Sequence, residues 1–177
     1  MTTPSIAQIS PRYDLLTRTL HWIFAIGILY ATAVGYGLHI MPAGPLHDFL
    51  SRLNMSLATV LILLYPVRSG WRLLRTNPAP PQGLSPQEYR PARLVQTLLY
   101  SIILAVLVSG YLMVPDGYHL FGLLPIPTPF AKGPATEAFF LLHRISCATL
   151  AALIGLHLLG VLVHTVLRPI GLLKRML

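Results

Sequence analysis

Four long apolar runs constrain the fold of this chain more than any other feature of its sequence. A helix needs about 20 apolar residues to cross the hydrocarbon core of a bilayer. The runs that reach this length cover about residues 15–40, 46–74, 92–114 and 136–167. We therefore predict that residues 1–177 form one all-α domain, a four-helix bundle that spans a membrane.

The charged residues support a membrane environment. The chain has 13 Lys and Arg against 5 Asp and Glu, a formal net charge of +8. A surface that binds nucleic acid needs its basic residues clustered on one water-exposed face, whereas here they flank the apolar runs. We therefore predict contact with membrane lipid and exclude a nucleic-acid partner. The single cysteine, Cys147, excludes an internal disulfide and a cysteine-based metal cluster.

The basic residues also predict the orientation in the membrane. Cytoplasmic flanks of membrane helices carry an excess of Lys and Arg. Ten of the 13 fall on the side that holds both termini and the segment between the second and third runs, and three fall on the other side. We therefore predict that both termini are cytoplasmic. The segment 115–134 is apolar for a loop, and we expect it to lie in the opposite membrane interface.

The histidines are the most informative polar residues in the apolar runs, because ionisable groups inside a membrane are costly and usually functional. His143 and His157 are 14 residues apart, so they share one helix face about 21 Å apart along the axis. They cannot share one ion, but they can hold two flat cofactors at two depths. His21 lies at a depth that matches His157, and imidazole is a common axial ligand of haem iron. The alternative is a helix–helix hydrogen bond, worth about 1 kcal/mol.

Several motifs, taken together and in order, make the chain resemble the bacterial cytochrome b561 family of small four-helix di-haem membrane proteins. The resemblance extends from Tyr13 to the C-terminus. The motifs that carry it are His21-Trp22, NMSLATVLILLYPVRSGWR from Asn54 to Arg72, Leu99-Tyr100, Gly110, the histidines His143, His157 and His164, and Lys174-Arg175-Met176.

The resemblance implies two sites for haem b. A cytoplasmic haem would be bound by His21 and His157, and a periplasmic haem by His143 and a residue of the second run. This chain departs from the family at that position, because Asn54 stands where the family has a histidine. Gln96 likewise stands where the family often has one.

Asn54 leaves three alternatives open, because an amide oxygen is a hard, weak ligand for haem iron. The outer haem is absent, or it is held by His143 alone with an open coordination position, or another side chain substitutes. Met55 points about 100° away from Asn54, and His47 lies about 10 Å nearer the outer surface.

Other polar residues have two interpretations each. Arg68 and Arg72 suit haem propionates, because guanidinium binds carboxylate in a bidentate way, but they are also expected as positive-inside anchors. The resemblance suggests a quinone site at His164, with Arg18 and Thr19 as neighbours. The alternative for His164 is a bond to lipid headgroups.

The resemblance implies a membrane b-type cytochrome of the bacterial inner membrane. It would transfer electrons between the ubiquinone pool and a periplasmic partner or superoxide, with one intact haem site, as a superoxide:quinone oxidoreductase-like enzyme. The alternative is a haem-binding membrane anchor or accessory subunit of a larger redox complex. A homodimer and a complex subunit are both compatible with the sequence. A transporter is disfavoured, because no pair of carboxylates falls in mid-membrane.

Overall fold

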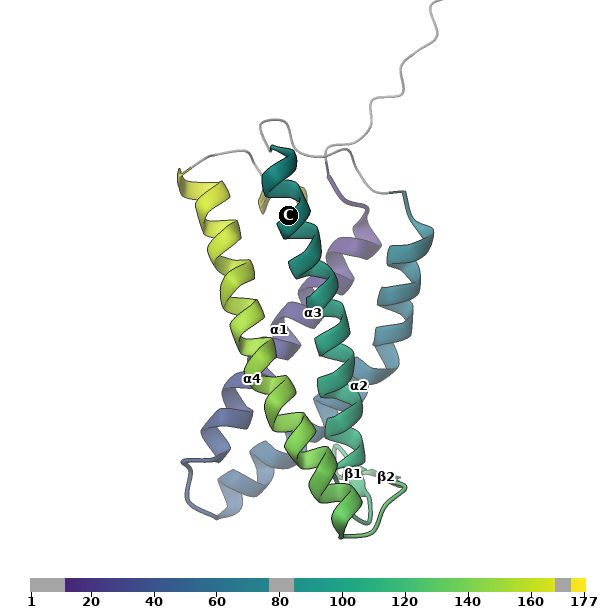
Figure 1. Cartoon of the computed structure of the whole chain (residues 1–177). Helices are drawn as coiled ribbons and strands as arrows, with labels where there is room; N and C mark the ends of the chain where they lie inside the picture. Colours follow the sequence, from purple (N-terminus) through teal and green to yellow (C-terminus); the bar gives the residue numbers. More distant parts are fainter. Residues whose placement is uncertain (1–11, 77–84, 168–172) are drawn as a thin grey trace, which may run out of the picture.

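The computed structural model describes residues 12–76, 85–167 and 173–177, and it confirms the predicted all-α membrane bundle (Figure 1). The elements are α1 (Leu15–Leu38), α2 (Pro45–Leu74), α3 (Pro86–Leu112), β1 (Tyr118–Leu120), β2 (Leu124–Ile126), α4 (Pro134–Leu162), the π-helical turn η1 (Val163–Leu167) and the 3₁₀ turn η2 (Leu173–Arg175).

The third helix begins six residues before the predicted start at 92. Ser85 accepts a hydrogen bond from the backbone N–H of Glu88 (3.3 Å), and the Glu88 carboxylate accepts one from the backbone N–H of Ser85 (3.1 Å). This reciprocal capping box, with Pro86 in the first helical position, starts a helix whose first turns are polar. Hydropathy alone assigned these turns to the preceding loop.

Between α3 and α4 the chain forms a short antiparallel hairpin rather than an irregular loop. β1 pairs with β2, and Phe121 and Gly122 make the turn between them with φ values of 50° and 76°. The hairpin is fixed on α2: the backbone N–H of Phe121 donates to Ser56 Oγ (2.8 Å), and the hydroxyls of Tyr118 and Thr59 are hydrogen-bonded. The apolar segment 115–134 therefore covers part of the bundle.

The helices pack in the order α1, α2, α3, α4, with the most extensive contact between α3 and α4. The buried core is formed by apolar side chains from all four helices: Phe24, Ile28, Leu61, Ile103, Leu107 and Leu150. Gly27 allows α1 to approach α2 closely, because a Cβ at this position would lie 3.1 Å from a methyl carbon of Leu61.

The outward faces of the helices are apolar, as expected for contact with lipid. Ile26 is 65% exposed and Leu63 is 68% exposed, and all four helices are long and apolar enough to cross a bilayer. Figure 1 shows the start of α1, the end of α2, the start of α3 and η2 at one end of the bundle, called here the Arg-rich end. The hairpin lies at the opposite end, called the hairpin end.

Candidate functional site

His21 lies in the second turn of α1, near the Arg-rich end, and is partly buried. Arg68 of α2 approaches it, with Nη2 3.5 Å from His21 Nδ1. The ring of Trp22 meets His21 edge-on, with centroids 5.5 Å apart. The sequence predicted His21 as a ligand and Arg68 as a neighbour of the haem, and these two side chains do lie side by side.

Aromatic rings surround the guanidinium of Arg68. Its central carbon lies 4.9 Å from the ring centroid of Phe24 and 5.2 Å from that of Tyr100. Arg72, one turn further along α2, lies 4.2 Å from the Tyr100 centroid and donates to Thr97 Oγ1 (3.1 Å). Cation–π contacts of this kind hold a cation where few anions are available. The role of Tyr100 was not predicted, because only the fold brings α3 beside these arginines.

His157 of α4 lies close enough to His21 for charges on the two rings to interact. Its ring makes no hydrogen bond with the residues that the structure describes. The helices that carry the two histidines make little direct contact, since α1 packs on α2 and α4 packs on α3. Two imidazoles that approach each other from helices not packed together are a suitable donor set for haem iron, so these residues fit the cofactor.

His143, nearer the hairpin end of α4, faces α3. Its Nδ1 lies 3.0 Å from the carbonyl oxygen of Val106 and 3.2 Å from Ser109 Oγ. Its Nε2 lies 3.4 Å from Cys147 Sγ, one turn along α4. The ring is packed against Gly110, where an added Cβ would lie 3.0 Å from His143 Cε1. His143 is thus surrounded by partners from α3 and from its own helix.

Asn54 of α2 is not joined to His143 by any polar contact among the described residues. Its amide oxygen is buried and has no hydrogen-bond partner there. Of the two substitutes considered above, His47 pairs with Asp48 at 3.3 Å in the first turn of α2. The position thus offers one imidazole and one amide, and because an amide oxygen is a weak ligand for haem iron, these two side chains do not fit a haem with two axial ligands.

A groove of about 600 Å³ opens beside the start of α1 at the Arg-rich end. Arg18, Thr19 and Trp22 line it together with the last residues of the chain. The Trp22 indole N–H donates to the Met176 carbonyl (2.9 Å), and Arg18 donates to the Leu177 carbonyl. The remaining lining residues are apolar: Leu15, Ile23, Ile26 and the side chains of Met176 and Leu177.

Two of the three residues predicted for a quinone site line this groove. Arg18 and Thr19 do so, whereas His164 lies in η1 and is not among the lining residues. The buried Nδ1 of His164 has no hydrogen-bond partner in the part of the chain that the structure describes. The sequence singled out Trp22 as part of the His21-Trp22 motif, and its hydrogen bond to Met176 depends on a fold-back of the C-terminal residues that hydropathy does not reveal.

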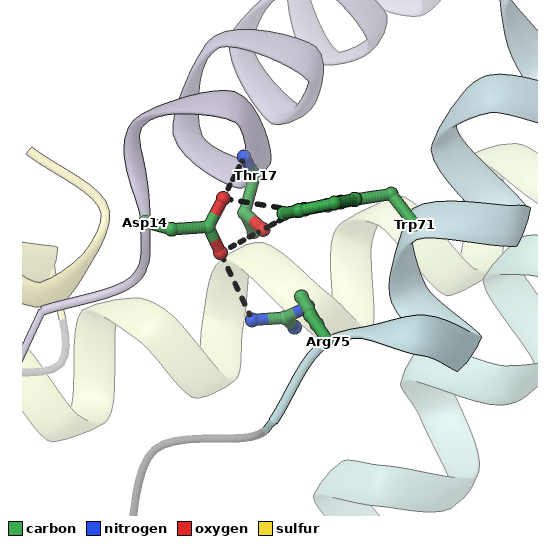
Figure 2. A network of polar contacts seen from close by, with 4 residues as sticks. All are labelled: Asp14, Thr17, Trp71 and Arg75. Carbon is green, nitrogen blue, oxygen red and sulfur yellow. Dashed lines mark hydrogen bonds and ion pairs between the residues drawn. The ribbon is translucent and has the colours of Figure 1, made fainter.

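A polar network fixes the start of α1 to the end of α2 beside this groove (Figure 2). Asp14 accepts hydrogen bonds from Thr17 N (2.9 Å) and Trp71 Nε1 (2.9 Å), and Arg75 lies 3.9 Å away. Burial raises the pKa of Asp14, but the hydrogen bonds from Thr17 and Trp71 and the charge of Arg75 outweigh it and lower the pKa below its usual value.

Four apolar spans that carry partly buried histidines define a class of multi-pass membrane protein that suits a cofactor held between helices. Comparisons with known proteins show the family. The family model described as prokaryotic cytochrome b561 matches residues 12–177. Cytochrome b561 homolog 2 of Escherichia coli (strain K12) is 27% identical over 185 residues, covering 98% of this chain and 95% of that protein.

The chain therefore belongs to the prokaryotic cytochrome b561 family, which confirms the family expected from its histidine motifs. It is a membrane b-type cytochrome of electron transfer. Family membership implies binding of haem b.

Proposed function

We propose that this cytochrome carries electrons between ubiquinone and a redox partner through a haem b whose iron is bound by His21 and His157. The observation that carries the proposal is that His21 lies near the start of α1 and His157 near the end of α4, at the same end of the bundle, and that the two rings interact electrostatically. Haem b, when bound, supplies an iron that gains and loses one electron. Arg68 and Arg72 supply positive charge for the propionates in the same region.

The groove at Arg18, Thr19 and Trp22 is the proposed quinone site. A quinone headgroup has two carbonyl acceptors, which would replace the Leu177 and Met176 oxygens to which Arg18 and Trp22 donate. The apolar side chains of Ile23 and Ile26 extend the groove along the lipid-facing surface of α1, where a quinone tail would lie. Trp22 also touches His21, so one side chain connects the quinone groove with the proposed haem ligand.

The electrons balance with superoxide as the partner. Two superoxide anions give up one electron each and leave as oxygen, and one quinone takes both electrons and two protons to become quinol. In this chain, Arg18 and Trp22 would hold the quinone carbonyls, and water at the Arg-rich end would supply the protons. A one-electron protein donor would replace superoxide with the same stoichiometry.

The test is rapid mixing of the purified, oxidised protein with ubiquinol while the visible spectrum is recorded. We expect the haem to be reduced by the quinol. Trp22→Phe, which removes the indole donor, should slow this step at least several-fold with unchanged haem content. Trp71→Phe is the matched control, because it removes an indole donor at the same end but outside the groove. Equal rates in both variants would remove the groove from the proposal.

A second function is a membrane subunit that serves a larger redox complex. The departure at Asn54 favours it, because a chain without an outer haem depends on a partner to complete an electron path. The purified chain alone distinguishes the two functions. Superoxide-driven quinone reduction by this chain would support the freestanding enzyme, whereas activity only after addition of a peripheral partner would support the subunit.

A further inference from the structure

The half of the bundle near the hairpin end differs in construction from the half that contains His21 and His157. Asn54 lies seven residues before the core residue Leu61, so both point to the same, inward face of α2. The position is thus correct for a ligand, but its side chain is an amide. The buried amide oxygen has no hydrogen-bond partner among the described residues.

His143 lies in this half and faces α3, and each of its ring nitrogens lies within 3.5 Å of a polar atom. A neutral imidazole has one N–H donor and one lone pair. Nδ1 faces the Val106 carbonyl at 3.0 Å and is the donor, so the lone pair lies on Nε2. Cys147 Sγ lies 3.4 Å from Nε2, next to the lone pair that iron would need.

The position of the His143 ring also serves helix packing. The ring touches α3 at Gly110, where a Cβ would lie 3.0 Å from it, and it contacts the fully buried Ser109 at 3.2 Å. Ser109 is held in turn by the Ala105 carbonyl (2.6 Å). These contacts join α3 to α4, the pair with the most extensive interface. A histidine that joins two helices through hydrogen bonds is the ordinary role of a polar residue in a membrane bundle.

The hairpin closes the same half from the side of α2. Ser56, two residues after Asn54, is completely buried and accepts from the Phe121 N–H, and Thr59 is bonded to Tyr118. Phe121 adopts a positive φ of 50°, which a bulky side chain rarely does. The hydrogen bond to Ser56 stabilises this conformation, so the hairpin is a built part of the bundle at this end.

We propose that this cytochrome holds a single haem, at His21 and His157, that His143 is a structural link between α3 and α4, and that both electron partners reach the haem from the Arg-rich end. The proposal rests on the inner haem of the proposed function. Without a second haem, the hairpin half of the bundle lies between the iron and the membrane surface at the hairpin end. Electron transfer slows steeply with distance, so a partner at that surface would exchange electrons with the iron slowly. The donor and the quinone therefore approach the same half of the bundle.

The first experiment measures haem per chain and the reduced visible spectrum of the purified full-length protein. We expect one haem per chain. We expect His143→Gln, which keeps an N–H donor but removes the imidazole, and His143→Ala to retain that haem with a low-spin spectrum. His157→Ala is the matched control on the same face of α4 and should lose most of the haem.

The outcomes separate this inference from the proposed function. Two haems per chain, or loss of haem in both His143 variants, would overturn the single-haem proposal and leave the inner site intact. A normal low-spin spectrum in His157→Ala would instead refute the His21/His157 site, and the present inference would fall with it.

The second experiment tests from which side the haem exchanges electrons. The protein is reconstituted in vesicles in one orientation, established by the accessibility of a C-terminal tag, and its haem is reduced. Ferricyanide, which does not cross the bilayer, is then added outside or trapped inside. We expect oxidation to be at least tenfold faster from the Arg-rich end. Equal or faster oxidation from the hairpin end would overturn the one-sided path.

Discussion

At the scale of single residues, the contact between Arg68 and His21 determines the state of the proposed ligand. Arginine remains protonated in proteins and can only donate hydrogen bonds. The 3.5 Å contact with His21 Nδ1 therefore places the imidazole lone pair on Nδ1. An imidazole that binds iron through Nε2 must instead carry its proton on Nδ1. Haem binding thus requires Arg68 to turn from His21 to another acceptor, and a haem propionate is such an acceptor.

The first prediction concerns the charge of Arg68. A positive charge near the iron favours the reduced haem, so Arg68→Leu should lower the midpoint potential by about 70 mV for a pair about 10 Å apart at an effective dielectric of about 20. A spectroscopic redox titration of the purified variant measures this. Arg68→Lys keeps the charge and should stay within a fraction of that shift. An unchanged potential in Arg68→Leu would place Arg68 away from the haem.

The second prediction concerns the missing ligand. Asn54→His supplies an imidazole at the half-buried position 54 of α2, and imidazole is a far better ligand for haem iron than an amide. We expect the haem content per chain to rise above that of the unmodified protein, measured by the pyridine haemochrome spectrum. Met55→His, on another face of α2, is the control and should leave the content unchanged. No gain in Asn54→His would mean that the ligand position of α2 lies elsewhere.

At the level of residues, the sequence predicts what helix geometry alone sets. Because His143 and His157 are 14 residues apart, the sequence places both on one face of a helix at different depths. It does not reveal that Arg68 lies over Tyr100, since this contact requires α3 to pack beside α2. The partners of His143 could not be predicted from the sequence either, because Val106 becomes a partner only through the packing of α3 on α4.

At the scale of elements, the start of α1 depends on Asp14. Its pKa is lowered, so the ionised carboxylate stabilises the folded state above its unfolded pKa of about 4, and this contribution is lost as the pH falls through the folded pKa. The third prediction is that Asp14→Ala costs about 1 kcal/mol, as for other helix N-caps. Thermal unfolding in detergent should show a lower Tm for the variant.

The pH dependence distinguishes this network from a general packing effect. The difference in Tm between the protein and Asp14→Ala should shrink as the pH is lowered from about 6 to about 3, because the native carboxylate then becomes protonated. Thr17→Val, which removes a hydroxyl partner but keeps the carboxylate, should lose less stability. A difference in Tm that is the same at every pH would contradict a role for the charge of Asp14.

The fourth prediction concerns the hairpin on α2. Ser56→Ala leaves the N–H of Phe121 without its acceptor, and an unsatisfied buried donor costs about 1–3 kcal/mol. We expect faster hydrogen exchange of the amides in β1 and β2, measured by mass spectrometry. Ser101→Ala is the control, since that exposed serine bonds only within α3. Unaltered exchange in Ser56→Ala would show that the hairpin does not depend on α2.

The elements were predictable from the sequence to the extent that apolar length defines them. The four spans follow from hydropathy, but the polar first turns of α3 depend on the Ser85–Glu88 capping box, which a hydropathy window averages away. The hairpin depends on Phe121 at positive φ. A phenylalanine rarely adopts that conformation, so the sequence does not predict a turn at Phe121. The hydrogen bond from the Phe121 N–H to Ser56 stabilises the turn.

At the scale of the whole molecule, the two ends of the bundle have different charge and different construction. The Arg-rich end contains the groove, the Asp14 network and the arginines around His21. The hairpin end contains an apolar cover and a hydrogen-bonded link between α3 and α4. The proposed haem ligands and the proposed quinone groove thus both lie toward the Arg-rich end. The side of the membrane that this surface faces therefore decides which partners the haem can meet.

The fifth prediction is that the Arg-rich end faces the cytoplasm, because ten of the 13 Lys and Arg flank the spans on that side. A C-terminal green fluorescent protein should fluoresce, and a C-terminal alkaline phosphatase should be inactive, since that enzyme needs the oxidising periplasm. Fusions after Leu123, in the hairpin turn, should give the reverse pattern and are the control. An active phosphatase at the C-terminus would show that the Arg-rich end faces the periplasm. The same single-haem architecture would then take its electrons from the periplasm, and a cytoplasmic partner would be excluded.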